Sequence, residues 1–191
     1  MQRRSKVYIA LLHYPMRNRR GDQITTSITN LDLHDIARAA RTYEVEGFFI
    51  VHPSPNQHEL IQQILHYWQE GYGGKYNADR KNAFERVHLA QHLEEVLELL
   101  TQHQQGPIYT VATDASPQLH SISYRELRSR IFQENQSYLL LFGTGWGMSP
   151  ELLERCDLIL DPIRAVGDYN HLSVRSAVAI ILDRLLNEDG I

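Results

Sequence analysis

The fold is decided by Tyr138-Leu-Leu-Leu-Phe-Gly-Thr-Gly-Trp-Gly-Met148, an apolar run that passes directly into a glycine-rich turn. The apolar half predicts a buried strand over 138–142, because strands of a parallel sheet that are covered on both faces read as continuous apolar runs. Ser149 to Arg155 then predicts a short helix. A strand, a glycine turn and a helix in this order are typical of an α/β fold.

The same pattern repeats immediately. Leu158-Ile-Leu160 predicts a second strand, and the loop from Asp161 to His171 leads from it to a long amphipathic helix opened by Ser173. Each strand ends in a loop rich in backbone N–H and C=O groups, which is where open α/β sheets bind ligands. The ligand site is therefore expected near the C-terminus.

Length and composition predict one domain that spans residues 1–191. The chain has 191 residues, of which 42% are hydrophobic and 22% charged, enough for one substantial core. The single cysteine, Cys156, excludes an intramolecular disulfide and fits a reducing compartment. The start lacks a signal-peptide apolar region, and no stretch approaches membrane-spanning length. We expect a cytoplasmic protein without membrane contact.

Charge is unevenly distributed along the chain. The formal net charge is −4, which argues against a protein that binds nucleic acid through overall basicity. Residues 1–20 nevertheless contain no acid and hold the basic residues Arg3, Arg4, Lys6, Arg17, Arg19 and Arg20. A local cationic patch can bind a phosphate backbone even on an acidic protein. A solvated terminus followed by a charged loop is the alternative interpretation.

The rest of the chain alternates between predicted strands and helices. Strands are predicted at Val7–Leu12, Phe48–Val51, Phe84–His88 and Ile108–Ala112. Helices are predicted from a cap at Asn30 or Asp32 to Ala40, from Leu60 to Trp68, from Leu89 to Leu100 and from Tyr124 to Phe132. The polar stretches His13–Thr29 and Gly71–Asn82 are predicted to be loops. This alternation predicts a mostly parallel sheet with helices on both faces.

Simpler motifs receive little support. Gly143-x-Gly-x-Gly147 lacks the G-x-G-x-x-G spacing of a dinucleotide turn, and too little chain follows it for such a domain. A tight strand–helix turn competes with that interpretation. His88 and His92 lack a partner at metal-site spacing, so they are expected to face solvent on a helix, and no metal is expected. Cys156 is expected to be a small core residue.

Three segments, taken together, indicate a family more clearly than any one of them does alone. They are Asp32-Leu-His-Asp-Ile-Ala-Arg38 with the strand Phe48–Val51 behind it, Leu140 to Asp157, and Asp161-Pro-Ile-Arg-Ala-Val-Gly167 followed by His171-Leu-Ser-Val174. In order and spacing they resemble the three motifs of the SPOUT-class RNA methyltransferases. The resemblance covers most of the chain. It implies an α/β fold with a C-terminal trefoil knot, S-adenosylmethionine as cofactor, tRNA or rRNA as substrate, and a symmetric homodimer.

The chain departs from the family pattern at three places. Relatives that methylate a ribose 2′-hydroxyl often carry asparagine where this chain has Asp32 and His171. Gly167-Asp-Tyr169 instead resembles part of the knotted loop of the tRNA guanine-N1 methyltransferases, although the extra C-terminal domain of that group is absent from this sequence. The chain looks most like a small SPOUT subfamily, and the methylated atom, guanine N1 or ribose 2′-hydroxyl, stays open.

The resemblance also implies the residues of the site. Arg38 matches the arginine of the first motif, and Asp168 is a candidate acceptor for a guanine N1 proton. An ion pair of Arg38 with Asp35 or Glu44 is the structural alternative. Arg19 and Arg20 are candidates for binding RNA phosphates. The residues implied to hold the cofactor are Ala112, Thr113, Asp114, Phe142, Gly143, Gly145, Gly147, Leu160, Ile163, Val166, Gly167 and Leu172.

Two hypotheses of different class follow from these residues. The first is a catalytic RNA methyltransferase, and the second is a knotted RNA- or nucleotide-binding protein without catalysis, because of the departures in the first and third motifs. A Rossmann oxidoreductase is disfavoured by the position of the glycine turn.

Overall fold

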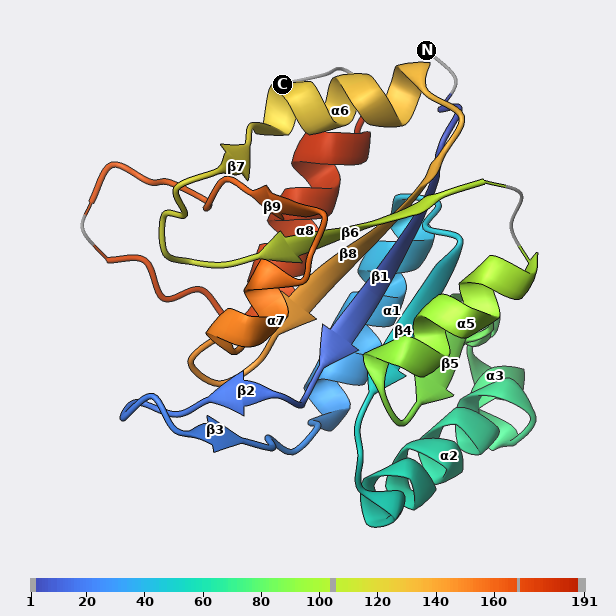
Figure 1. The fold of residues 1–191 in the computed structure, drawn as a ribbon. Helices are drawn as coiled ribbons and strands as arrows, with labels where there is room; N and C mark the ends of the chain where they lie inside the picture. The colour runs from blue at the N-terminus through green and yellow to red at the C-terminus, as the bar shows by residue number, and fades with distance from the viewer. Residues whose placement is uncertain (1–2, 104–105, 168, 189–191) are drawn as a thin grey trace.

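A seven-stranded sheet forms the centre of the molecule (Figure 1). The computed structural model describes residues 3–103, 106–167 and 169–188. Within them the sheet has the strand order β5-β4-β1-β8-β6-β9-β7, and its strand pairs are parallel. The strands are β1 (Lys6–Leu12), β4 (Gly47–Val51), β5 (Val87–Ala90), β6 (Ile108–Thr113), β7 (Ser121–Ile122), β8 (Ser137–Gly143) and β9 (Leu158–Leu160). The predicted α/β class is therefore confirmed.

The two central strands come from opposite ends of the sequence. β1 pairs with β8 from Lys6 opposite Ser137 to Leu12 opposite Gly143. Because the strands are parallel and in register, both end at the same edge of the sheet. The chain that follows β1 therefore meets the glycine turn that follows β8.

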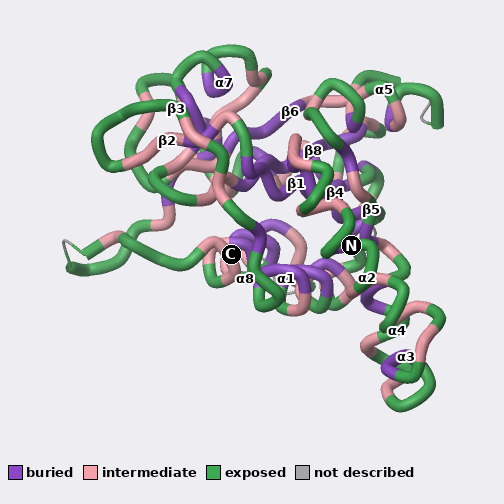
Figure 2. Tube along the Cα trace, turned by 90° about the horizontal axis from the view of Figure 1, so that it is seen from below, coloured by how far each residue is buried: buried purple, intermediate pink, exposed green. Residues whose placement is uncertain are grey.

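Helices cover both faces, as predicted. The helices are α1 (Asn30–Thr42), α2 (Pro55–Gln69), α3 (Tyr72–Tyr76), α4 (Ala78–Phe84), α5 (Leu93–His103), α6 (Tyr124–Gln133), α7 (Pro150–Glu154) and α8 (Val174–Leu186). Residues of α1, α2, α4, α6 and α8 share one buried cluster with alternate residues of β1, and residues of α5 and α7 share the other. In Figure 1, α1 and α8 lie behind the sheet, whereas α5 and α7 lie in front of it. Figure 2 shows the buried strands between these two layers.

Hydroxyl side chains cap four of the helices. The side chains of Thr29, Ser123, Ser149 and Ser173 each accept a hydrogen bond from a backbone N–H in the first helical turn. At α1 the cap is reciprocal, because the Asp32 carboxylate accepts from the Thr29 N–H. The predicted cap at Ser173 is confirmed. The predicted cap at Asn30 or Asp32 is wrong, since Thr29 is the N-cap and Asp32 completes its box.

The prediction of a loop over Gly71–Asn82 is wrong, because α3 and α4 occupy it. The Asn77 side chain caps α4 by accepting from the Arg80 N–H at 2.9 Å. A Cβ atom at Gly74 would lie 2.3 Å from the carbonyl oxygen of Trp68. That glycine therefore serves close packing of α3 on α2, and it is not a sign of an irregular loop.

Two further boundaries differ from the expectation. Phe84 ends α4, and Leu89 lies in β5, so the strand predicted at Phe84–His88 is shifted and the next helix begins only at Leu93. The expected loop His13–Thr29 contains a small antiparallel hairpin, β2 (Met16–Arg17) and β3 (Gln23–Ile24). In the described part of the chain, no helix has the length and apolar character that crossing a bilayer requires.

Candidate functional site

Three loops that the family resemblance implied to hold the cofactor meet at the carboxyl edge of the sheet. They follow β6, β8 and β9, which are neighbours of one another in the sheet. The Asn170 side chain donates to the Ala115 carbonyl at 2.8 Å, which joins the loop after β9 to the loop after β6. The ring of Trp146, in the turn after β8, lies 6.4 Å from that of His171. The loops that were expected to hold a cofactor therefore form one continuous surface.

The glycine turn depends on backbone conformations that only glycine adopts readily. Gly145 has φ +62° and Gly147 has φ +94°. Space is restricted as well, because a Cβ atom at Gly145 would lie 3.2 Å from the Arg17 carbonyl oxygen. Ser149 ends the turn by capping α7. The turn thus combines the tight strand–helix geometry with close approach of another segment.

That other segment is the β2–β3 hairpin. The Arg17 N–H donates to the Gly147 carbonyl at 2.9 Å, and the Trp146 N–H donates to the Arg17 carbonyl at 3.1 Å. Met16 and Met148 form an antiparallel bridge beside these bonds. In Figure 1 the hairpin projects beneath α7 at the carboxyl edge of the sheet. The basic segment after β1 is thus bonded directly to the turn after β8.

Arg17 and Asp114 form a pair over this turn. Arg17 Nη2 lies 3.7 Å from Asp114 Oδ2, and the Asp114 side chain is only 5% exposed. Asp114 Oδ1 accepts from the Ser116 N–H at 2.7 Å. Oδ2 of Asp114 and Nε of Arg17 are buried and have no hydrogen-bond partner. A Cβ atom at Gly147 would lie 3.3 Å from Asp114 Oδ2.

Sequence reasoning identified Asp114 but missed Arg17 as part of this surface. Arg17 belongs to the early basic residues, but only Arg19 and Arg20 are predicted to contact a ligand. The available signal was Gly21-Asp22 between short alternating segments, which is typical of a hairpin turn. A hairpin starting after β1 would have placed Arg17 nearest to the sheet edge.

A buried histidine–threonine network lies beneath the turn. Thr26 Oγ1 hydrogen bonds to His13 Nδ1 at 3.0 Å and to the hydroxyl of Thr144 in the turn. The Thr144 hydroxyl also donates to the Leu12 carbonyl at 3.1 Å. The rings of His13 and His52 lie 5.3 Å apart. Burial, with a smaller contribution from His52, lowers the pKa of His13 to about 4, so His13 is neutral at physiological pH.

The predicted cofactor residues differ in what they expose. Ala112, Phe142 and Leu160 are buried in the core, so only their main-chain groups can reach a ligand. Ile163 packs against the core as well. The other two predicted apolar residues of the third loop are open to solvent, with Leu172 47% exposed and Val166 fully exposed. Thr113 is half-buried, and its hydroxyl donates to the Leu141 carbonyl at 2.8 Å.

Of the two predicted catalytic residues, only Arg38 lies in the described part of the chain. Asp168 lies outside the described residues. Arg38 is exposed on α1 and lines a shallow surface hollow with Asn77, Asp79 and Arg80. One chain therefore does not bring Arg38 to its own three loops.

The expected ion-pair partners of Arg38 bind other residues. Asp35 pairs with Arg175 of α8 at 3.6 Å. Glu44 pairs with Arg41 and Arg86.

The departures from the family pattern have structural roles. Besides completing the capping box of α1, Asp32 lies 3.7 Å from Arg175 and so links α1 to α8. His171 stands between Trp146 and the ring of Tyr169, whose centroid is 5.2 Å away. Trp146 and Tyr169 are 55% and 76% exposed. The third loop thus presents aromatic side chains beside the glycine turn.

The predicted RNA-binding arginines lie at the tip of the hairpin. Arg19 and Arg20 are both exposed, and the Arg20 N–H donates to Asn18 Oδ1 at 2.8 Å within the hairpin turn. Neither arginine forms an ion pair among the described residues. Both guanidinium groups remain available to solvent or to an anionic partner.

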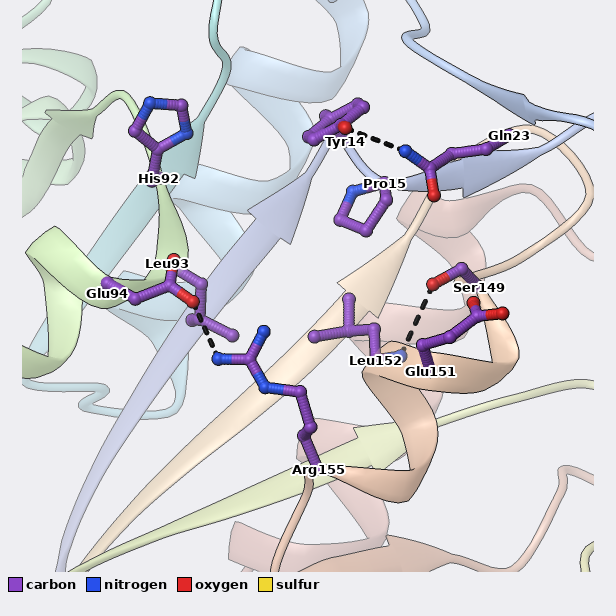
Figure 3. Close-up of a pocket in the computed structure, with 10 residues that line it drawn as sticks. All are labelled: Tyr14, Pro15, Gln23, His92, Leu93, Glu94, Ser149, Glu151, Leu152 and Arg155. Carbon is purple, nitrogen blue, oxygen red and sulfur yellow. Dashed lines mark hydrogen bonds and ion pairs between the residues drawn. The ribbon is translucent and has the colours of Figure 1, made fainter.

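A cavity of about 260 Å³ lies between the base of the hairpin, α5 and α7 (Figure 3). Tyr14 and Gln23 contribute one wall, where Gln23 Nε2 donates to the Tyr14 hydroxyl oxygen at 2.7 Å. Arg155 pairs with Glu94 at 2.7 Å across the opposite wall. None of the predicted cofactor residues lines this cavity. It is therefore a separate feature of the carboxyl edge.

Histidine and cysteine chemistry does not define the site. His88 lies in β5 and His92 in the connection after it, so the expected helical pair is wrong. Across the described ranges, no three His, Cys, Asp or Glu side chains are arranged to hold a metal ion. Cys156 is half-buried between α7 and β9, and burial raises its pKa to about 11. It packs against the second core cluster, which confirms the prediction of a core residue.

The surface fits the cofactor that the resemblance implies. Asp114 Oδ2 is a buried acceptor without a donor, and a hydroxyl or ammonium group of a nucleoside-bearing ligand would supply one. The glycines leave the turn without side chains where a ring could approach its main chain. Phe142, Gly143, Gly145, Gly147, Thr113 and Leu160 would contribute mainly through their backbones.

Comparisons with known proteins identify the family and the fold. Residues 6–187 match the family model described as SAM-dependent RNA methyltransferase. A probable methyltransferase from Bordetella pertussis has a TM-score of 0.59 at 19% identity, covering 93% of this chain and 92% of that one. The SpoU methyltransferase AviRb from Streptomyces viridochromogenes, solved with AdoMet, has a TM-score of 0.61 at 15% identity, covering 100% and 61%. These two likenesses show the fold.

Relatives found by sequence comparison are more nearly identical to this chain than the two solved structures are. An uncharacterized protein of Aquifex aeolicus is 44% identical over 96% of this chain and 89% of its own length. A tRNA (guanine-N(1)-)-methyltransferase of Nitratidesulfovibrio vulgaris is 39% identical over 95% of this chain, but only 42% of that protein is covered. More than half of the second relative therefore lies outside the shared region. From the extent of the family match and from these identities, the chain belongs to the S-adenosylmethionine-dependent RNA methyltransferases.

Proposed function

We propose that this chain methylates tRNA, with the cofactor between the loops after β6, β8 and β9 and the RNA held by the β2–β3 hairpin. One observation carries this proposal: the arginine-bearing hairpin is hydrogen bonded to the glycine turn, through Arg17 on one side and Trp146 and Gly147 on the other. An RNA bound by the hairpin would therefore lie beside the cofactor loops. Relatives that are named tRNA (guanine-N(1)-)-methyltransferase, about 40% identical to this chain, support tRNA as the RNA class.

The proposed roles follow from chemistry and position. Arg19 and Arg20 bind backbone phosphates, because they are exposed cations on a projecting turn. Asp114 accepts a hydrogen bond from the cofactor, and the exposed ring of Trp146 supplies an apolar surface beside it. When bound, S-adenosylmethionine supplies an activated methyl group on a sulfonium. The chain then has to orient the acceptor and remove one proton, and Asp168 remains our proposed acceptor for that proton.

The position of Arg38 favours a homodimer. If Arg38 acts in methyl transfer, it acts at the loops of a second copy, because in its own chain it lies beside α4. Leu31, on the same helix, is 59% exposed, which suits an interface that α1 helps to form. Mixing Arg38→Ala protein with Gly145→Val protein tests this directly. Recovery of activity in the mixture, where each variant alone is inactive, supports a shared site; a mixture as inactive as its parts contradicts it.

The sequence resemblance supports three further proposals. The C-terminal segment is threaded through the loop after β9 to form a trefoil knot, the chain acts as one domain, and the protein works in the cytoplasm. β9 and α8 lie on different layers of the fold, so the 161–173 segment must cross from the sheet edge to the face that carries α1. An experimental structure in which that segment returns without threading contradicts the knot.

Nucleoside mass spectrometry identifies the target. We compare tRNA and rRNA from cells with and without this protein and look for one methylated nucleoside that disappears. Loss of a methylated guanosine or of a 2′-O-methylated nucleoside from tRNA supports the proposal and decides between guanine N1 and ribose 2′-hydroxyl. Unchanged tRNA with an rRNA nucleoside lost moves the substrate to rRNA, and no loss in either RNA contradicts the proposal.

A further inference from the structure

The segment 13–26 and the turn 143–149 are built as one unit. Besides the two backbone bonds of Arg17, the Ser149 N–H donates to the Pro15 carbonyl at 3.1 Å. Thr26 reaches the turn through its hydroxyl bond to Thr144. Bonds therefore connect the two segments at the base, middle and far end of the turn. A movement of the hairpin cannot leave the turn unchanged.

Arg17 of this unit forms an incomplete pair with Asp114, which lies in the loop after β6. Its closest separation of 3.7 Å exceeds hydrogen-bond length, so the attraction is only that of two charges. Buried polar groups are nearly always hydrogen bonded, and leaving one unsatisfied costs about 1–3 kcal/mol. Asp114 Oδ2 and Arg17 Nε are two such groups on facing side chains. Both are satisfied if a ligand donor binds Asp114 and an anionic or carbonyl acceptor binds Arg17.

Resting on the proposed function, we propose that Arg17 is a positioning residue that couples RNA binding to cofactor binding. RNA phosphates fix the hairpin, and the fixed hairpin holds Asp114 and the glycine turn in the conformation that binds the cofactor. Coupling of this kind is reciprocal, so the cofactor strengthens RNA binding by the same factor by which RNA strengthens cofactor binding. The first ligand to bind orders the shared unit and loses conformational entropy in doing so. The second ligand then binds a unit that is already ordered and does not lose that entropy again.

The test measures two affinities at one fixed salt concentration, because RNA affinity depends strongly on salt. Fluorescence anisotropy gives the Kd of labelled, unfractionated tRNA with and without S-adenosylhomocysteine, which cannot react. Calorimetry gives the Kd of S-adenosylhomocysteine with and without tRNA. For the unaltered chain we expect both ratios to agree at about tenfold, within the usual range for coupled sites.

Matched variants separate coupling from simple RNA contact. Arg19→Gln removes an exposed arginine of the same hairpin and should weaken tRNA binding with and without the cofactor product equally, so its ratio stays at that of the unaltered chain. Arg17→Gln should reduce the ratio to about one, and Arg17→Lys should recover only part of it, because Lys lacks the planar fork. A merely structural role of Arg17 would lower stability without moving the ratio.

An RNA-free measurement keeps this proposal separate from the proposed function. Arg17→Gln should weaken S-adenosylhomocysteine binding several-fold in the absence of RNA, and combining it with Asp114→Asn should add little, since both act on one pair. If Arg17→Gln leaves this affinity unchanged, or if the coupling ratio of the unaltered chain is one, the coupling role of Arg17 is wrong. If tRNA does not bind at all, the proposed substrate fails, and the RNA-free titration alone decides whether Arg17 supports the cofactor site.

Discussion

Comparing Gly147→Ala with Gly21→Ala shows whether the turn needs glycine at position 147 for space or only for its positive φ angle. Gly147 has φ +94°, and its added Cβ would lie 3.3 Å from Asp114 Oδ2 and 3.4 Å from Arg17 Nη2. Gly21 in the hairpin turn is a matched control, since it has φ +90° and no atom within 4 Å of an added Cβ. Both alanines bear the strain of a left-handed conformation, about 1–2 kcal/mol. Only the alanine at 147 also displaces the buried pair.

The expected difference follows from that displacement. Moving Arg17 away leaves the buried Asp114 carboxylate without its charge partner, which adds about 1 kcal/mol. For a chain of this length, 1 kcal/mol corresponds to a Tm shift of about 2–4 °C. Gly147→Ala should therefore melt about 2–4 °C below Gly21→Ala, as followed by circular dichroism. It should also weaken S-adenosylmethionine binding in calorimetry, whereas Gly21→Ala should leave that affinity unchanged.

Equal melting temperatures for the two variants, together with equal cofactor affinities, would refute this reasoning. In that case Gly147 would be needed for its backbone conformation alone. The Arg17–Asp114 pair would then have enough freedom to move aside at no measurable cost.

Three further predictions concern stability and reactivity. Burial lowers the pKa of His13 to about 4, so below about pH 6.5 the unfolded chain takes up a proton that the folded chain does not, and His13 contributes a loss of stability of up to about 3 kcal/mol towards pH 4. Burial lowers the pKa values of His34, His52 and His88 as well, so His13→Gln should reduce the pH slope of stability in urea unfolding without abolishing it. An equal slope in the variant contradicts the prediction. Thr29→Ala removes a capping-box bond and should lower the free energy of unfolding by about 1 kcal/mol. Ser54→Ala, at an N-cap without a side-chain hydrogen bond, should lower it little in the same assay, and equal losses would contradict the role of the Thr29 cap. With its pKa raised to about 11, Cys156 should react slowly with a disulfide reagent at pH 8 and rapidly after unfolding, and fast reaction of the folded protein would place the thiol in a different environment.

The core of the fold could be predicted because its strands are continuous apolar runs. The apolar runs Val7–Leu12 and Tyr138–Phe142 predict buried strands. In the structure these two strands pair with each other at the centre of the sheet. Ser149 and Ser173 marked helix starts for the same local reason, since each hydroxyl satisfies a backbone N–H in the first turn.

Features that depend on tertiary packing could not be predicted from local patterns. Gly73 and Gly74 suggested a loop, but they are buried where α3 meets α2. Two-residue strands such as Met16–Arg17 give no periodicity to detect. Their pairing is stabilised by the turn after β8, which lies far away in the sequence.

The candidate site was predicted at the level of loops better than at the level of side chains. The family resemblance implied the three loops, and they meet in the structure because they follow neighbouring parallel strands. Whether Arg17 or Arg19 faces the turn depends on the register of the hairpin, and the face that Arg38 occupies depends on how α1 packs against α4. Neither is encoded in spacing alone. The role of Asp168 stays a prediction, because that residue is outside the described part.

Transfer of a labelled methyl group tests the central claim most directly. Purified protein is incubated with S-adenosylmethionine carrying a tritiated methyl group and with unfractionated tRNA, and label in the RNA is counted after cofactor removal. We predict time-dependent labelling of tRNA that is strongly reduced by Gly145→Val, whose side chain would meet the Arg17 carbonyl and Thr26. Labelling that Gly145→Val leaves at the level of the unaltered protein, or tRNA that stays unlabelled although calorimetry shows bound cofactor, would contradict the claim.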